Sequence, residues 1–177
     1  KYVKARTERK ICLVVLGVDN AGKTTLLNTL QGELDKEASP TFGFSLVEGT
    51  SRSLGLSGHN VSLQVFDLGG GKNIRRLWKS YLSEVHGVVF VIDAANASRF
   101  EECKQVLHQT LEHEQLHSKP VLLFANKQDL EGAATAVDLA QQLELSSLQN
   151  SRFRIMACTA KTPSGGAPDR RLQEGIS

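Results

Sequence analysis

A phosphate-binding loop constrains the fold of this chain of 177 residues more than any other feature of its sequence. Residues 17–24 read Gly-Val-Asp-Asn-Ala-Gly-Lys-Thr, which matches the spacing glycine, any four residues, glycine, lysine, threonine. The apolar run 11–16 before the loop predicts a buried strand, and segment 23–31 after it predicts a helix. The alternative, a glycine-rich turn that happens to carry Lys-Thr, is disfavoured by these flanks. The sequence therefore predicts a bound nucleoside triphosphate.

Glycines in such a loop let the backbone wrap closely round phosphates, so that amide N–H groups and the positive end of the helix face the charged oxygens. Lys23 adds a cation for the β- and γ-phosphates, and the Thr24 hydroxyl is placed to ligate a magnesium ion that bridges the same oxygens. We therefore assign nucleotide contacts to the residues of this loop and helix start, namely Asp19, Asn20, Ala21, Gly22, Lys23, Thr24 and Thr25.

A polar tetrad, Asn126-Lys127-Gln128-Asp129, follows the apolar run 120–125 and indicates which base is bound. It falls where open α/β sheets bind ligands, at the carboxyl end of a predicted strand. The Asp129 carboxylate can accept two hydrogen bonds from the N1–H and 2-amino group of guanine, whereas adenine offers no such adjacent donors. Asn126 is expected to hold the loop and meet N7, and the stem of Lys127 to lie along the ring.

A third segment, Thr159, Ala160 and Lys161, follows the strand-like run 153–156. It would complete the base site, with the Ala160 N–H donating to the guanine O6. The tetrad alone is an ordinary loop sequence, but its occurrence together with the phosphate loop and this segment favours GTP and GDP as ligands.

Two intervening loops are predicted to sense the γ-phosphate. Thr41 lies in the loop 39–44, and Asp67 ends an apolar strand just before three glycines. Thr41 would complete the magnesium shell, Asp67 would hold the metal through water, and the Gly70 N–H would meet the γ-phosphate. Loss of that phosphate would release both loops. For Pro40-Thr41 taken alone, a plain turn is the simpler interpretation.

Alternating strand and helix patterns predict one α/β domain over residues 1–177, a doubly wound and mostly parallel sheet with flanking helices. A net charge of +2 gives no reason to expect nucleic acid as a partner. The sequence contains no stretch of eighteen apolar residues, so it does not predict a membrane-spanning helix.

In order and spacing, the motifs GVDNAGKTT, PTFGF, FDLGGG with IRRLWKSYL, and NKQD resemble the Arf and Arf-like branch of the Ras-type small GTPases. FDLGGG, PTFGFS and ANKQDLEGA are most similar to the ciliary Arf-like thirteen subfamily, associated with Joubert syndrome. The resemblance implies a P-loop G domain fold, GTP/GDP and Mg²⁺ as ligands, and a place at the cytoplasmic face of the ciliary membrane. It also implies that effectors bind the switch loops, for which the candidate contacts are Phe42, Arg76, Trp78 and Tyr81.

One position departs from that family. Most members carry a glutamine that orients the attacking water, and Gly71 stands at its place here, so we assign no catalytic residue. Nucleotide binding would survive while intrinsic turnover becomes very slow. His86, Arg75 and Arg76 are conceivable substitutes, although surface or partner contacts explain each of them more simply.

Two functional classes remain. The resemblance implies a GTP-loaded switch that acts as an exchange factor for a sister GTPase, Arf-like three; the alternative is a conventional hydrolysing Arf-like GTPase of membrane traffic that needs an activating partner. A P-loop kinase would leave residues 126–129 without a role.

We also expect a piece of a longer protein, lacking an N-terminal segment involved in membrane association, the last helix and a C-terminal extension. The interval 46–61 looks longer than the hairpin between the Arf switches.

Overall fold

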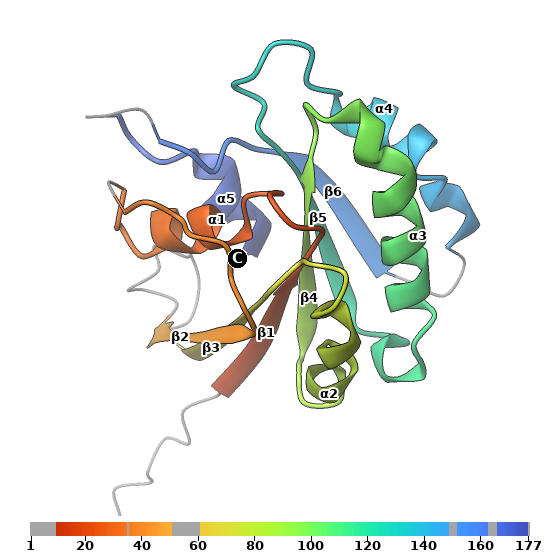
Figure 1. The fold of residues 1–177 in the computed structure, drawn as a ribbon. Coiled ribbons are helices and arrows are strands. Elements are labelled where there is room, and N and C mark those ends of the chain that lie inside the picture. Colours follow the sequence, from red (N-terminus) through yellow and green to blue (C-terminus); the bar gives the residue numbers. More distant parts are fainter. Residues whose placement is uncertain (1–9, 35, 51–60, 149–151, 163–165, 177) are drawn as a thin grey trace, which may run out of the picture.

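The computed structural model of the chain describes residues 10–34, 36–50, 61–148, 152–162 and 166–176. Within them a sheet of six strands has the order β2-β3-β1-β4-β5-β6, in which β2 runs antiparallel to β3 and every other neighbouring pair is parallel. The predicted doubly wound, mostly parallel sheet is thereby confirmed (Figure 1). The strands are β1 (Lys10–Leu16), β2 (Phe44–Thr50), β3 (Ser62–Leu68), β4 (Gly87–Asp93), β5 (Pro120–Asn126) and β6 (Arg152–Ala157).

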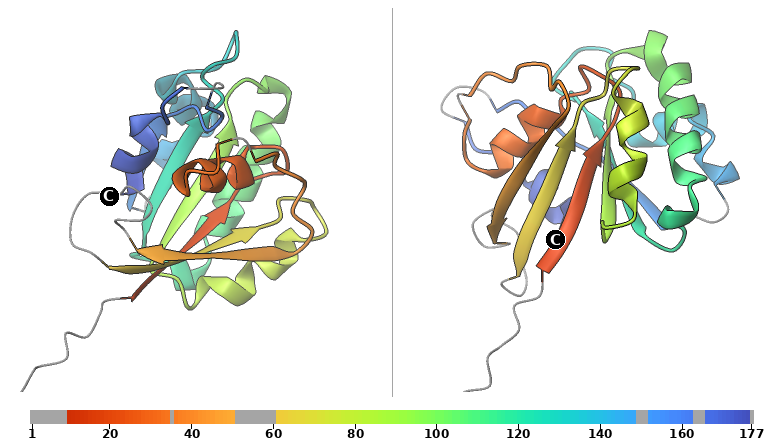
Figure 2. Two further views of the ribbon diagram at one scale, coloured as in Figure 1. Left: turned by 90° about the vertical axis from the view of Figure 1, so that its left-hand side faces the viewer. Right: turned by 60° about the horizontal axis from the view of Figure 1, so that its bottom comes forward.

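Helices cover both faces of the sheet (Figures 1 and 2). Helices α1 (Lys23–Leu30) and α5 (Arg170–Ile176) lie on one face, and α2 (Lys79–Leu82), α3 (Phe100–Leu111) and α4 (Ala136–Gln142) lie on the other. Short 3-10 helices are η1 (Arg75–Leu77), η2 (Ala97–Arg99), η3 (Glu114–Leu116) and η4 (Leu145–Ser147). Most of the interval that we expected to be long, 46–61, lies outside the described residues.

The central strands are buried on both faces, which explains their continuous apolar sequences. In β4 all residues but the last are buried, and Phe90 and Phe124 are fully enclosed. Trp78 belongs to this core: it is 3% exposed, and its ring meets the edge of Phe90 at 6.4 Å between centroids. The prediction that Trp78 is displayed to partners is therefore wrong. Burying the large indole removes its apolar surface from water, which stabilises the fold more than exposing the ring would.

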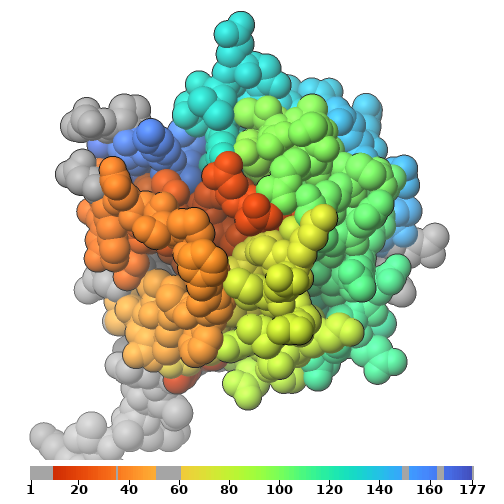
Figure 3. All heavy atoms as spheres, viewed as in Figure 1, coloured from red at the N-terminus to blue at the C-terminus, as the bar shows by residue number. Residues whose placement is uncertain are grey.

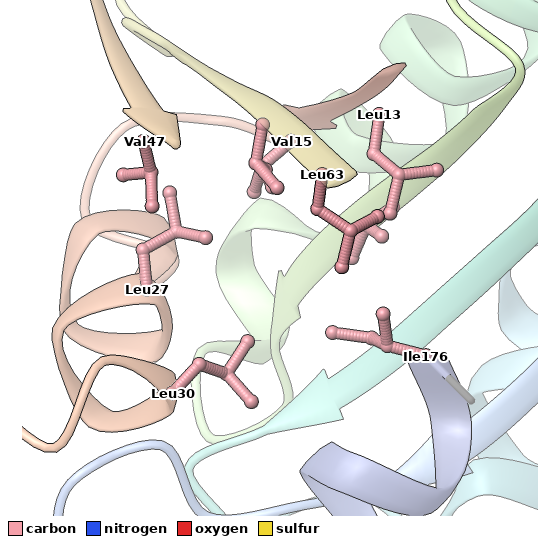
Figure 4. Close-up of a pocket in the computed structure, with 9 residues that line it drawn as sticks. Leu13, Val15, Leu27, Leu30, Val47, Leu63 and Ile176 are labelled. Carbon is pink, nitrogen blue, oxygen red and sulfur yellow. The ribbon is translucent and has the colours of Figure 1, made fainter. Parts of the chain in front are cut away.

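An apolar cavity lies between α1, the sheet and the end of α5 (Figure 4). Leu27, Val47, Leu63 and Ile176 are among the side chains around it. Its volume of about 10 Å³ is at the lower limit for one water molecule, and its walls are wholly apolar. It is a packing gap between elements and has no room for a ligand.

Strand register places the predicted site residues together. Val15 pairs with Asp67 across β1 and β3, so the phosphate loop emerges beside Asp67. Asp93 pairs with Asn126 across β4 and β5. The loops after these strands gather at the carboxyl edge of the sheet, around the position where the strand order reverses, and this is where doubly wound sheets bind nucleotides.

Candidate nucleotide-binding site

The phosphate loop joins β1 to α1 with two glycines at positive φ. Gly17 has φ of +141°, and a Cβ added to it would collide with the Val91 carbonyl. Gly22 has φ of +96°, and an added Cβ would collide with the Asn126 side chain. Both positions therefore require glycine, for its conformational freedom as well as for space. The helix begins directly after Gly22, so its free N–H groups face the loop interior.

Lys23 is the buried cation of the loop, with 6% exposure. Its Nζ donates to the Gly17 carbonyl at 3.0 Å and the Val18 carbonyl at 2.9 Å. Burial lowers the pKa of Lys23 to about 8, against the opposing attraction of the Asp67 and Asp19 carboxylates. The folded chain thus holds an ammonium group whose charge is incompletely compensated, a suitable partner for phosphate oxygens.

The three side chains predicted to surround magnesium do converge. Thr24 Oγ1 donates to Asp67 Oδ2 at 2.7 Å and lies 3.0 Å from Thr41 Oγ1, which is 3.3 Å from the same carboxylate oxygen. Asp67 is 1% exposed, and its Oδ1 has no hydrogen-bond partner among the residues that the structure describes. Hydroxyl and carboxylate oxygens around an unsatisfied buried anion fit a hard divalent cation such as Mg²⁺. The described residues contain no cluster of three His, Cys, Asp or Glu of the kind that holds other metals.

A pocket of about 500 Å³ lies over this cluster. The phosphate loop, residues 38–42, and Gly70, Gly71 and Ile74 line it. In the space-filling view the phosphate loop (red) sits between the segment near residue 40 (orange) and the segment after residue 70 (yellow) (Figure 3). The pocket therefore brings the loop and both predicted switches to one ligand, on its phosphate side.

Two adjacent glycines of the second switch differ in their surroundings. A Cβ on Gly70 would collide with the backbone of Asp19 and Gly17, so this glycine packs directly on the phosphate loop. A Cβ on Gly71 would meet nothing within 4 Å. Gly70 is required for the close approach, whereas the space beside Gly71, at the position where the family resemblance predicts a glutamine, is open.

At the base side, Asn126 is 1% exposed and ties two loops together. Its Nδ2 donates to the Ala21 carbonyl at 2.8 Å, and its Oδ1 accepts from the Ala160 N–H at 2.8 Å. The predicted loop-holding role of Asn126 matches this geometry. The predicted contact from Ala160 N–H to guanine O6 stays a prediction, since Asn126 takes that donor here.

The other base-site residues lie round this anchor. Lys127 donates to Asp93 Oδ2 at 2.7 Å, which fixes its stem beside the loop. The Thr159 N–H donates to Asp169 Oδ2 at 2.9 Å, so the residue just before α5 positions the third segment. Asp129 and Lys161 are exposed. The guanine contact of Asp129 stays a prediction, for which its exposed carboxylate is available.

An ionic network behind the phosphate loop was missed by the sequence analysis. Arg99 donates to the backbone and side chain of Asp19, each at 2.8 Å, and Glu102 accepts from Arg99 at 2.8 Å and from Arg75 at 2.7 Å. Arg75 Nε also donates to the Gly70 carbonyl at 2.6 Å. The guanidinium groups of Arg75 and Arg99 hold the pKa of Glu102 below its usual value. The network connects α3, the second switch and the phosphate loop.

The contacts of Arg75, Arg76 and His86 bear on whether each could orient water in place of the glutamine that the family resemblance predicts at position 71. Arg75 is already engaged by Glu102 and the Gly70 carbonyl. His86 precedes β4 and accepts a hydrogen bond from the Cys12 N–H through Nδ1, at the opposite end of the sheet from the nucleotide pocket. The suggestion that His86 replaces the amide is therefore wrong. Arg76 is exposed and does not line the nucleotide pocket.

A second missed contact is that of Thr29, a buried hydroxyl in α1. Its Oγ1 donates to the Ala160 carbonyl at 2.6 Å and so attaches the phosphate-loop helix to the base loop. No local pattern reveals a pair of residues 131 positions apart. Only the fold brings them together.

The outer surface of the switch segments exposes aromatic side chains. Phe42 is 89% exposed and Phe44 57% exposed. Tyr81 is half-buried, with its ring centroid 5.5 Å from that of Phe44 and 5.2 Å from that of Phe66. Exposed aromatic side chains in this number favour protein contact. Of the four predicted partner residues, Phe42, Arg76 and Tyr81 reach the surface and Trp78 does not.

No helix among the described residues combines the length and apolar character needed to cross a bilayer. The comparisons with known proteins bear on the remaining expectations. A model of the ADP-ribosylation factor family matches residues 2–171. Over 99% of its length the chain is 48% identical to ADP-ribosylation factor-like protein 13B of Chlamydomonas reinhardtii, and it spans only 32% of that protein.

Shorter relatives are covered almost completely. The chain is 39% identical to ADP-ribosylation factor-like protein 3 of C. reinhardtii, covering 97% of the chain and 89% of that protein. It is 37% identical to ADP-ribosylation factor-like protein 2 of Dictyostelium discoideum, covering 96% and 85%. The structure of the Arl6 BBS3 small GTPase of Trypanosoma brucei with bound GppNp superimposes with a TM-score of 0.78 at 30% identity, covering 94% of this chain and 93% of that one. The chain belongs to the ADP-ribosylation factor family of small GTPases, a family that binds guanine nucleotides.

Proposed function

We propose that this chain is a GTP-loaded molecular switch with little or no intrinsic hydrolysis. The observation that carries the proposal is the open space at Gly71, where an amide would orient water, beside the converging side chains of Thr24, Thr41 and Asp67. Phosphoryl transfer depends mainly on positioning and charge stabilisation. A site that keeps the charges and loses the positioning group would bind GTP and convert it slowly.

The chain's own residues account for binding in this proposal. Lys23 would place its ammonium group against the β- and γ-phosphates, while backbone N–H groups of residues 19–25 would surround them. Magnesium would be held by the Thr24 and Thr41 hydroxyls, with Asp67 acting through water, and would supply positive charge to the same oxygens. The Gly70 N–H would contact the γ-phosphate and so hold the second switch.

The output proposed for the GTP state is exchange-factor activity toward Arf-like three, at the cytoplasmic face of the ciliary membrane. Support comes from the 48% identity to ADP-ribosylation factor-like protein 13B and from the exposed apolar and basic face that includes Phe42, Arg76 and Tyr81. With the γ-phosphate retained, this face would stay ordered and would favour a partner conformation with an open phosphate site.

A nucleotide-release assay tests this output. Arf-like three is loaded with fluorescent GDP, and release is followed with the chain in its GTP form, in its GDP form, and as Arg76→Ala, a variant outside the nucleotide pocket. We expect the GTP form to accelerate release, the GDP form to be weaker, and Arg76→Ala to lose acceleration while retaining nucleotide affinity. No acceleration by the GTP form would refute the exchange activity of this chain, and equal rates for the two forms would refute switching.

The second candidate is a conventional hydrolysing GTPase whose water is positioned by a partner. The open space around Gly71 favours it to this extent: a side chain supplied in trans could enter where the chain has none. Hydrolysis that is slow alone and fast with an activating protein of the Arf family would establish this candidate.

A further inference from the structure

The nucleotide pocket contains a carboxylate whose charge opposes its expected ligand. Among the described residues that line the pocket, Asp19 is the only acidic one and Lys23 is the only basic one. The Asp19 side chain is 57% exposed. A negative charge at this place repels phosphate oxygens. An isolated carboxylate would therefore weaken the binding that Lys23 and the loop backbone favour.

Asp19 lies at the end of the pocket that we assign to the γ-phosphate. A Cβ added to Gly70 would collide with the Asp19 backbone nitrogen, so the two backbones are packed together. The Gly70 N–H is the group that we expect to meet the γ-phosphate. Arg75 reaches the same place, because its Nε donates to the Gly70 carbonyl and its Nη2 lies 3.6 Å from Asp19 Oδ1. The Asp19 carboxylate would therefore act mainly on the phosphate that GTP carries and GDP lacks.

Arg99, at the end of η2, holds this carboxylate and compensates its charge. Its Nη2 donates to Asp19 Oδ1 and its Nη1 donates to the Asp19 carbonyl, each at 2.8 Å. Glu102 fixes the same guanidinium through hydrogen bonds of 2.8 and 3.0 Å from Nη2 and Nε. The bond from Arg99 lowers the pKa of Asp19, so the carboxylate is ionised at neutral pH. Arg99 itself is not among the residues that line the pocket.

We propose that Arg99 is a positioning residue that enables the loop to accept the γ-phosphate, because it cancels the charge of Asp19 and fixes its side chain. Arg99 thereby raises the preference for GTP over GDP without touching the nucleotide. This inference rests on the proposed switch function and deepens it, since it names a residue outside the pocket that controls binding of the third phosphate. A purely structural role of Arg99 would affect both nucleotides equally.

Affinities of the whole chain for GDP and for the non-hydrolysable analogue GppNp, measured by calorimetry in Mg²⁺, test the proposal. Arg99→Met removes the charge and keeps an apolar stem. We expect it to weaken GppNp by about fivefold to tenfold and GDP by about twofold at most. Arg99→Lys keeps the charge and should retain most of the preference for GppNp. The difference between Arg99→Met and wild type should shrink as salt rises.

Removal of the carboxylate separates charge compensation from structural support. Adding Asp19→Asn to Arg99→Met should restore the ratio of the two affinities to within about twofold of wild type, because no uncompensated carboxylate remains. Asp19→Asn alone leaves Arg99 uncompensated and should increase the preference for GppNp. The matched control is Arg154→Met, which removes an exposed arginine from the edge strand β6 and should leave both affinities unchanged.

Equal weakening of GDP and GppNp in Arg99→Met would overturn the proposal, as would a loss that Asp19→Asn does not restore. Thermal unfolding identifies a variant that does not fold. If Arg99→Met is such a variant, Asp19→Asn alone decides, and a reduced preference for GppNp there contradicts the proposal. Wild-type chain that binds neither nucleotide would contradict the proposed switch function instead. Wild-type binding of both, with the ratio unchanged in Arg99→Met, would contradict only the role of Arg99.

Discussion

The phosphate half of the site and the base half are built differently. On the phosphate side the charged groups are buried and every functional group is already bonded: Lys23 (6% exposed) donates to carbonyls of the phosphate loop, and Asp67 (1% exposed) accepts from Thr24. The half-buried Thr24 and Thr41 hydroxyls lie 3.0 Å apart. On the base side Asn126 is a buried anchor, but the predicted reader of the base, Asp129, is exposed. The difference places the preorganised groups where the ligand carries most charge.

Preorganisation has a cost that the ligand removes. Burial disfavours the charged form of Lys23, and one oxygen of the buried Asp67 lacks a hydrogen-bond partner within the described part of the chain. Phosphate and Mg²⁺ would satisfy both groups at once. Asp129 carries no such cost before the base arrives, so we expect it to contribute selectivity among bases more than total affinity.

The largest effect should follow from Lys23→Ala. Removing a buried cation from the phosphates should weaken both GDP and GTP by about a hundredfold or more, since charge-assisted bonds in a partly desolvated site are strong. Calorimetric titration of the purified chain measures this, with Lys104→Ala on helix α3 as the control. Wild-type affinity in the Lys23 variant would show that the loop does not bind phosphates.

Asp129→Asn should have the next largest effect and a different character. Loss of the carboxylate should weaken guanine nucleotides by about tenfold to a hundredfold, because two charge-assisted hydrogen bonds are lost. The amide can donate to the carbonyl that replaces the 2-amino group in xanthine, so xanthosine diphosphate should gain affinity. The control is Glu131→Gln, an exposed neighbour in the same loop. Unchanged preference for guanine would remove Asp129 from the base site.

Sequence analysis gave access to part of each half of the site. Short motifs identify the phosphate loop, Asp67 and the tetrad 126–129, because each depends on local backbone geometry at the end of a strand. The mostly parallel sheet with flanking helices was predicted from the alternation of strand and helix patterns, whereas the order of the strands was not predicted. Contacts between distant segments left no local sign: Thr29 with Ala160, and Arg99 with Asp19, become visible only in the fold.

The motifs also did not predict which side chains of the switch segments are buried. Trp78 belongs to a switch segment, and its aromatic character suggested an interface. In the structure its Nε1 donates to the Gly69 carbonyl at 3.0 Å and its ring packs on Phe90. The indole supports the switch from inside, a role that residue type alone does not distinguish from partner contact.

The pH dependence of binding should reflect the phosphate half alone. In the free chain the pKa of Lys23 is lowered to about 8, and phosphate binding should raise it, so binding above this pH requires proton uptake. Between pH 7 and 9 the dissociation constant for GDP should rise by about tenfold. Calorimetry in buffers of different ionisation enthalpy would detect the proton. Lys23→Arg, which does not titrate in this range, should show a flat profile, and the same slope in both proteins would contradict this assignment.

Without nucleotide, the same group has the opposite effect on stability. Because the folded pKa of Lys23 lies below the unfolded value, the unfolded chain binds more protons between about pH 8 and 10.5. The Lys23 contribution to stability should therefore increase with pH across that window. The difference between wild type and Lys23→Met in the free energy of unfolding, measured at several pH values, isolates this contribution, and a difference that does not change with pH would contradict it.

The smallest expected effect concerns the link between the halves. Thr29→Val keeps the shape of the side chain but leaves the Ala160 carbonyl without its donor, which should lower stability by about 1–2 kcal/mol. GDP affinity should fall only a few-fold, through a looser base loop. Thr110→Val in α3, whose hydroxyl bonds within its own helix, is the control for stability. A loss of affinity as large as that of Asp129→Asn would mean that the base half is preorganised after all.

Single-turnover hydrolysis tests the central claim most directly. The chain is loaded with GTP at saturating Mg²⁺, free nucleotide is removed, and the ratio of GTP to GDP on the protein is followed over long incubation. With Gly71 at the water-orienting position, we predict that the bound nucleotide stays GTP for as long as it does on a small GTPase whose switch glutamine has been removed. Rapid conversion to GDP by the chain alone would contradict the account.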